Sequence, residues 1–92
     1  MEIELDWDIQ AVDHIDKHGV DQLEVDELFR RKRFYLRKVK SGYVAIGRTN
    51  GRLLLVAIVP SDRAKGKFKV VTARDAETPE RDLFKRRRKG SR

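Results

Sequence analysis

The chain has 92 residues, of which 40% are charged and 39% apolar, with no cysteine and a formal net charge of +7. This length suits one small domain with a narrow core. The lack of cysteine excludes a disulfide framework and thiolate chemistry. The acidic start is unlike a signal or transit peptide, and the longest apolar run, residues 53–59, is too short to cross a membrane. We therefore expect a soluble cytoplasmic domain.

Charge is divided sharply along the chain. Residues 1–29 hold ten carboxylates and one base, Lys17, for a formal charge of −9, whereas residues 30–92 hold 21 bases and five carboxylates, for +16. A strong field of one sign is typical of a surface that meets an oppositely charged polymer. We predict a polyanion-binding surface in residues 30–92, with RNA or DNA as its ligand.

The first 30 residues are predicted to form a short strand and two helices. Apolar and acidic residues alternate over 2–6, which favours a strand. Asp8 can cap a helix that ends at Gly19. The apolar face of this helix is expected to comprise Ile9, Val12 and Ile15.

A second helix is predicted over about residues 22–30. Asp21 and Glu24 have the spacing of a capping box that opens it. Its buried residues are expected to be Leu23, Leu28 and Phe29.

Four strands are then expected, over 33–39, 43–49, 52–59 and 67–74. Asn50-Gly51 between the second and third of them is a strong hairpin signal. The third strand is apolar on both faces, as expected for a central position.

A last helix is predicted to open at Thr78-Pro79, with Thr78 as its cap. Residues 1–84 are expected to form the domain, and the basic residues 85–92 a frayed tail. The order β-α-α-β-β-β-β-α predicts an α+β fold, with an antiparallel sheet packed against helices on one side.

Two arginines are predicted to end apolar stripes on neighbouring strands. Arg48 follows Val44 and Ile46 in alternation, and Arg74 follows Phe68, Val70 and Thr72. If both strands flank 52–59, the two guanidinium groups emerge at the same end, about 10 Å apart. They could then grip phosphates, or each could simply reach solvent past the core.

His18 lies in the last turn of the first predicted helix. Its imidazolium can interact with the helix dipole there, or the side chain can serve catalysis. His14 lies one turn earlier. No third ligand is evident, so we expect no metal site.

The basic surface is expected to bind nucleic acid. Tyr35, between Arg33 and Arg37, is the best candidate to stack on a base. The residues predicted to bind nucleic acid are Arg33, Tyr35, Arg37, Arg48, Lys67 and Lys69.

A series of short segments resembles the BrnT-type toxins. The segments are Trp7-Asp8, Lys17-His18-Gly19-Val20, Ile46-Gly47-Arg48, Thr72-Ala73-Arg74-Asp75-Ala76 and Glu80-Arg81. The resemblance covers about residues 5–84. It implies a RelE-like fold, RNA cleavage that halts growth, and a DNA-binding antitoxin encoded alongside that masks the site.

The same resemblance implies the catalytic residues. Metal-free attack by a 2′-hydroxyl needs a base, an acid and positive charge on the phosphate oxygens. Arginine can supply only the charge, so that role falls to Arg74, helped by Arg48. Acid–base work would fall to His18 and Glu80, with Lys17 in reserve.

Two other functions fit the sequence. Many relatives carry a Glu-Arg pair where this chain has Ser41-Gly42, and its loss favours a non-catalytic module that binds nucleic acid or the ribosome. Alternatively, the acidic first segment could dock on the basic face of another copy to form a homo-oligomer.

Overall fold

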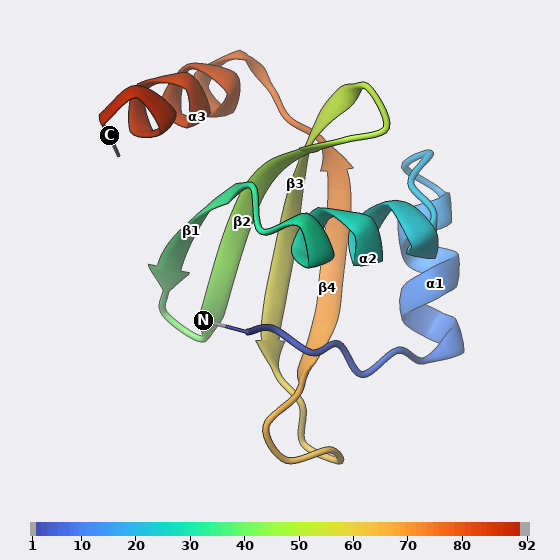
Figure 1. The fold of residues 1–92 in the computed structure, drawn as a ribbon. Coiled ribbons are helices and arrows are strands. Elements are labelled where there is room, and N and C mark those ends of the chain that lie inside the picture. The colour runs from blue at the N-terminus through green and yellow to red at the C-terminus, as the bar shows by residue number, and fades with distance from the viewer. Residues whose placement is uncertain (1, 91–92) are drawn as a thin grey trace.

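A computed structural model describes residues 2–90 of the chain, and for residues 88–90 only the backbone. It has three helices and four strands (Figure 1). In chain order these are α1 (Ile9–Asp16), α2 (Gln22–Arg31), β1 (Phe34–Val39), β2 (Gly42–Thr49), β3 (Arg52–Pro60), β4 (Phe68–Asp75) and α3 (Thr78–Gly90). The α+β class is confirmed, and α3 continues to Gly90 through residues that the sequence assigned to a frayed tail.

The sheet is an antiparallel meander in the order β1-β2-β3-β4. Strands β2 and β4 therefore flank β3 and run in the same direction, as predicted. Asn50 and Gly51 both have positive φ, 50° and 79°. This is the conformation that a two-residue hairpin with the twist of the sheet requires.

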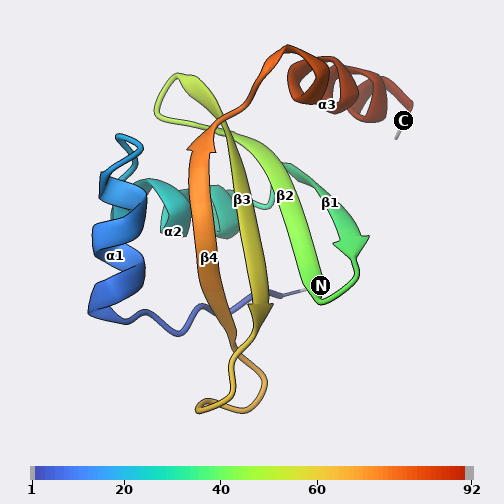
Figure 2. The ribbon, with the colours of Figure 1, turned by 180° about the vertical axis from the view of Figure 1, so that it is seen from behind.

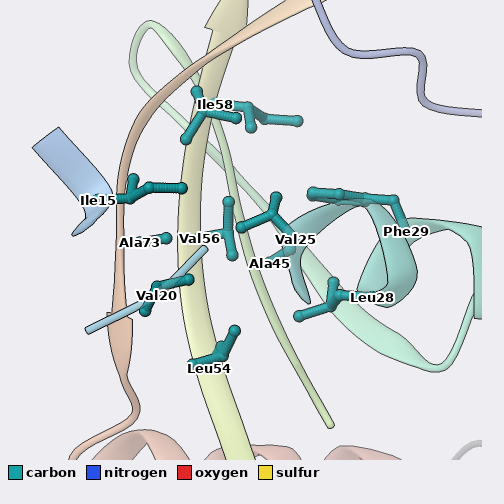
Figure 3. Close-up of a cluster of buried hydrophobic side chains, with 11 residues drawn as sticks. Ile15, Val20, Val25, Leu28, Phe29, Ala45, Leu54, Val56, Ile58 and Ala73 are labelled. Carbon is teal, nitrogen blue, oxygen red and sulfur yellow. The ribbon is translucent and has the colours of Figure 1, made fainter. Parts of the chain in front are cut away.

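The main core lies between one face of the sheet, here called the inner face, and the helices α1 and α2 (Figure 3). Ile15 of α1 and Val25 and Leu28 of α2 pack there against residues of the strands. Alternation along the strands supplies Ala45, Val56 and Ala73, which are aligned across the sheet. The two helices are thus anchored by the same face.

The outer face of the sheet carries α3, so the expectation of helices on one side only was wrong. Phe84 is buried in a second cluster with Ile46 and Leu53, and Leu83 and Tyr35 pack against it. Helix α3 contacts β1 and β2 at one end of the sheet (Figure 2). Helix α3 follows β4 in the chain and therefore crosses over β3 to reach β2 and the opposite edge strand, β1.

The predicted first strand is reduced to a single parallel bridge between Leu5 and Phe68 of β4. Two backbone hydrogen bonds hold it, from Asp6 N–H to the Phe68 carbonyl and from Phe68 N–H to the Glu4 carbonyl. Toward the N-terminus the segment runs across the lower ends of β4 and β3 in the view of Figure 1, and Glu2 pairs with Lys32 just after α2. No ladder forms because the chain turns at once into the Asp8 cap of α1.

A bulge in β4 overturns the predicted stripe that ended in Arg74. The register shifts at Ala57/Ile58, so Val71 has no partner on β3 and is 49% exposed. The extra residue changes which face each side chain joins. Val70 and Ala73 point to the inner core, whereas Arg74 pairs across with Leu55 on the outer face.

The predicted caps of α1 and α2 are present. The Asp8 carboxylate accepts from Ala11 N–H, and Asp21 and Glu24 form both bonds of the capping box. Two apolar positions were placed wrongly: Ile9 is 73% and Leu23 75% exposed.

No helix in the described part of the chain is long and apolar enough to span a membrane.

Candidate nucleic-acid interface

A surface pocket of about 530 Å³ lies where α3 meets the start of β1 and the end of β2. Its lining has four cationic and three aromatic residues and no carboxylate: Lys32, Arg33, Phe34, Tyr35, Arg48, Phe84 and Arg87. Its volume falls within the range of pockets that hold small organic ligands. Cations beside aromatic rings are the usual composition of a site for unpaired nucleotides.

The sheet register brings the predicted binding residues together here. Tyr35 of β1 lies opposite Ile46 of β2, and Arg48 follows two residues later on the same face. Arg33 directly precedes β1. Three residues from the predicted set, Arg33, Tyr35 and Arg48, therefore share the pocket.

Helix α3 closes the pocket from the outer side. Its buried Phe84 anchors it to the sheet, and one turn later the Arg87 guanidinium lies over the Tyr35 ring, 5.3 Å from its centroid. This is cation–π geometry. Arg87 was not among the predicted binding residues, because the basic residues 85–92 were expected to form a frayed tail. The spacing of Phe84 and Arg87 was the available signal.

Most cations of the pocket lack a carboxylate partner. Lys32 pairs with Glu2 at 2.9 Å. Among the described residues, none of Arg33, Arg48 and Arg87 forms an ion pair. Their guanidinium groups thus retain donors for an anionic ligand.

Arg74 and Glu80 are brought together as a bidentate pair. Arg74 Nη1 and Nη2 donate to the two Glu80 oxygens at 3.0 and 2.8 Å, and Nη1 also donates to the Asp75 carbonyl at 3.0 Å. Glu80 further accepts from Glu77 N–H at 2.7 Å. That bond places Glu77, rather than Thr78, in the cap position of α3. The pair fastens the end of β4 to the start of α3.

This pairing limits what Glu80 can do chemically. The hydrogen bond from Arg74 lowers the pKa of the Glu80 carboxyl, and burial opposes this only in part. The carboxylate is therefore ionised at neutral pH and cannot donate a proton. As a base it is weakened by the same guanidinium.

His18 and Lys17 lie at the end of α1, next to Gly19, whose carbonyl shares the Arg52 guanidinium with Asp75. Both side chains are exposed, and the His18 ring packs edge-on against His14 with their centroids 5.3 Å apart. Ile15 anchors α1 on the inner face, whereas Arg74 points to the outer face. The structure thus does not gather the four predicted catalytic residues around one hollow.

Arg52, which was not among the predicted site residues, connects two of the short segments described above, residues 17–20 and residues 72–76. Arg52 Nη2 donates to the Gly19 carbonyl and to Glu24 Oε1, both at 2.6 Å, and Nη1 donates to Asp75 at 3.2 Å. Burial raises the pKa of Glu24, but the hydrogen bonds, first that from Arg52, bring its pKa below the usual value. Arg52 therefore holds the segment after His18 beside the end of β4. A charge at the start of an apolar strand was the only sequence signal.

The other predicted binding residues lie away from the pocket. Arg37 is exposed on the outer face opposite Val44. Lys69 pairs with Val59 near the start of β4, at the far end of the sheet, and Lys67 lies in the loop before it. They extend the basic character of the outer face without joining the pocket.

No family model, curated protein or solved structure matches this chain. Among the described residues, no group of three or more histidine or carboxylate side chains could hold a metal ion.

Proposed function

We propose that this protein is a cytoplasmic, toxin-like endoribonuclease that holds RNA at the basic aromatic pocket beside α3. The observation that carries this proposal is the lining of that pocket, where cations and rings meet without a carboxylate. A polyanion with flat bases satisfies both features.

A RelE-like arrangement of the BrnT type fits the order of elements. Two helices precede the antiparallel meander, and a third follows it. Segments of the BrnT-like series also meet at one end of the sheet, because Arg52 binds both the Gly19 carbonyl and Asp75. In this proposal a cognate DNA-binding antitoxin masks the basic face, and the RNA target is free or ribosome-bound.

The proposed reaction is attack of a 2′-oxygen on the adjacent phosphorus. The P–O5′ bond breaks, the 2′-proton passes to a base, and the leaving 5′-oxygen takes up a proton. Arg48 and Arg74 carry the charge that develops on the phosphate oxygens. Glu80 is ionised and can act only as the base, whereas His18 and Lys17 would need to approach from the neighbouring element.

Cleavage of a labelled RNA by the purified chain in chelator tests this proposal. We expect a 2′,3′-cyclic phosphate product, resistance of a strand with 2′-deoxy sugars, and growth arrest on expression. Arg74→Ala and Arg48→Ala should each slow cleavage about 10²–10³-fold. Arg86→Ala, which removes a charge from α3 outside the pocket, is the matched control. Equal cleavage by all variants would point to a contaminating nuclease and contradict the proposal.

A second function, binding of RNA without cleavage, is favoured by the Arg74–Glu80 pair. Both guanidinium termini of Arg74 are already engaged there, and an anion must compete with Glu80 to reach them. Salt-sensitive binding with intact RNA after long incubation would establish this alternative.

A further inference from the structure

The pocket beside α3 has a geometry that favours one form of nucleic acid. Tyr35 is half-buried on β1, so its ring lies at the wall of a recess rather than on a protruding ridge. In a duplex the base faces are stacked on one another and cannot reach a recessed ring. Bases of single strands, loops and bulges can.

Two of the cations of the pocket lie together beside the Tyr35 ring. Arg48 is on β2, one strand spacing of about 4.8 Å from β1. Continuing the register by one position from the pair Phe34 and Gly47 sets Arg33 opposite Arg48. Both guanidinium groups therefore lie on the side of Tyr35 where β1 starts, where they can bind the phosphates next to a base that contacts the ring.

Arg87 can change its stacking partner from Tyr35 to a base. Its side chain is exposed on α3, and the contact with Tyr35 is its only interaction identified among the described residues. Guanidinium planes stack on bases as readily as on aromatic rings. A base that enters the pocket can thus be held between Tyr35 and Arg87.

We infer that the pocket takes one unpaired nucleotide of a single-stranded RNA. The base stacks between Tyr35 and Arg87, and the flanking phosphates bind Arg33 and Arg48. This inference rests on the proposed function only in that RNA is the ligand, and it holds whether or not the strand is cleaved.

Fluorescence anisotropy with the full chain in chelator tests the inference. The probes are a labelled 12-nucleotide RNA, the same strand in a blunt duplex, and a version in which abasic sites replace the bases. To keep each probe intact, the three carry 2′-methoxy groups. We expect the single strand to bind at least about tenfold more tightly than either other probe.

Substitutions measure how much each side chain of the pocket contributes to the affinity for the single strand. Tyr35→Leu keeps an apolar residue at this position but removes the stacking ring, and should weaken single-strand binding by about 5–100-fold with little effect on the duplex. Arg87→Ala should weaken it by a smaller factor, and Arg86→Ala by less than about twofold. Arg48→Ala should reduce the slope of log affinity against log salt by about 0.7.

The outcomes of these binding measurements separate the unpaired-nucleotide site from the ribonuclease proposal. Equal affinity for duplex and single strand, or an unchanged affinity in both Tyr35→Leu and Arg87→Ala, would overturn the unpaired-nucleotide site and leave the ribonuclease proposal standing. Absence of binding to all three probes would overturn both. If Tyr35→Leu unfolds, as circular dichroism would reveal, Arg87→Ala alone decides, because its side chain supports no core.

Discussion

At the scale of single residues, the most connected side chain is Arg52. Burial of Glu24 is tolerated because Arg52 donates to both of its oxygens, at 2.6 and 3.1 Å, and the same guanidinium reaches Gly19 and Asp75. The side chain of Glu24 is only 10% exposed. Without a partner this carboxylate would be a desolvated charge, which proteins rarely accommodate.

Replacing Arg52 should therefore destabilise the whole domain. We expect Arg52→Ala to reduce the free energy of unfolding by about 2–3 kcal/mol, because it leaves a buried carboxylate unpaired. Arg31→Ala breaks the exposed pair with Glu27 on α2 and should cost about 0.3–0.5 kcal/mol. Urea denaturation compares the two. Similar losses would show that the Arg52 network is no more than a surface ion pair.

At the scale of elements, α3 forms one wall of the pocket and is attached to the sheet at few points. It has 13 residues, too few for a stable helix in isolation. Its attachments are the Arg74–Glu80 pair at its start and the packing of Phe84 and Leu83 on the outer face. The proposed RNA binding at the pocket would thus depend on a helix that one ion pair and two apolar side chains keep in place.

Truncation of that side chain should release α3 while the sheet stays folded. In Phe84→Ala we expect the amides of α3 to exchange at nearly free-chain rates, because about 3 kcal/mol of docking is lost. The amides of β3 should keep their protection. Hydrogen exchange measures both, with Arg86→Ala as the control that leaves α3 docked. Loss of protection in β3 as well would mean that α3 and the sheet unfold as one unit.

Signals between residues close in the sequence predicted most of the helices and strands. The features that they did not predict depend on packing between elements far apart in the sequence. The Asn50-Gly51 hairpin and the Asp21–Glu24 capping box depend on residues a few positions apart, and both are present. The exposure of Leu23 depends on how α2 is rotated on the sheet, which its own sequence does not specify. The face reached by α3 likewise depends on Phe84 meeting distant strands.

The candidate site was predictable only in part, for the same reason. The sequence predicts Arg33, Tyr35 and Arg48 as binding residues at two neighbouring strands, and the three do share a pocket. The direction of Arg74, away from the sheet face that carries α1, was not visible in the sequence. It follows from the bulge in β4, and alternation of side chains predicts the opposite parity.

At the scale of the whole molecule, most of the carboxylates in residues 1–29 form contacts within the domain. Glu2, Asp6, Glu24 and Glu27 all form ion pairs with bases from later in the chain. Asp8 and Asp21 cap helices. Residues 1–29 thus neutralise bases in and after α2, Arg52 of β3 and Arg63 in the loop before β4. Among the described residues, Arg33, Arg48 and Arg87 of the pocket form no ion pair, so the pocket keeps most of its positive charge.

Asp6 should give the domain a specific sensitivity to acid. The hydrogen bonds from Arg63, and then from Ser61, lower the pKa of Asp6 from 3.8 to about 2. A carboxyl whose folded pKa is lowered stabilises the fold above its unfolded pKa and loses that contribution as pH falls through the folded value. This stabilisation should therefore disappear between about pH 4 and pH 2.

Thermal unfolding of Asp6→Asn across that range tests the assignment. Relative to the native chain, the variant should melt at a lower temperature at pH 6, and the difference should shrink toward pH 2. Asp13→Asn, on the exposed face of α1, should show a small difference at every pH. A difference for Asp6→Asn that does not change with pH would exclude the ion pair as its cause.

The unpaired Val71 also constrains how this chain can vary in length. Deleting that one residue would join Val70 directly to Thr72 and leave a regular ladder, because Thr72, Ala73 and Arg74 already pair with Ala57, Val56 and Leu55. Ala73 would stay in the inner core and Arg74 on the outer face. A one-residue deletion at Val71 should therefore be tolerated, whereas a one-residue insertion next to it would reverse the two faces for the rest of the strand.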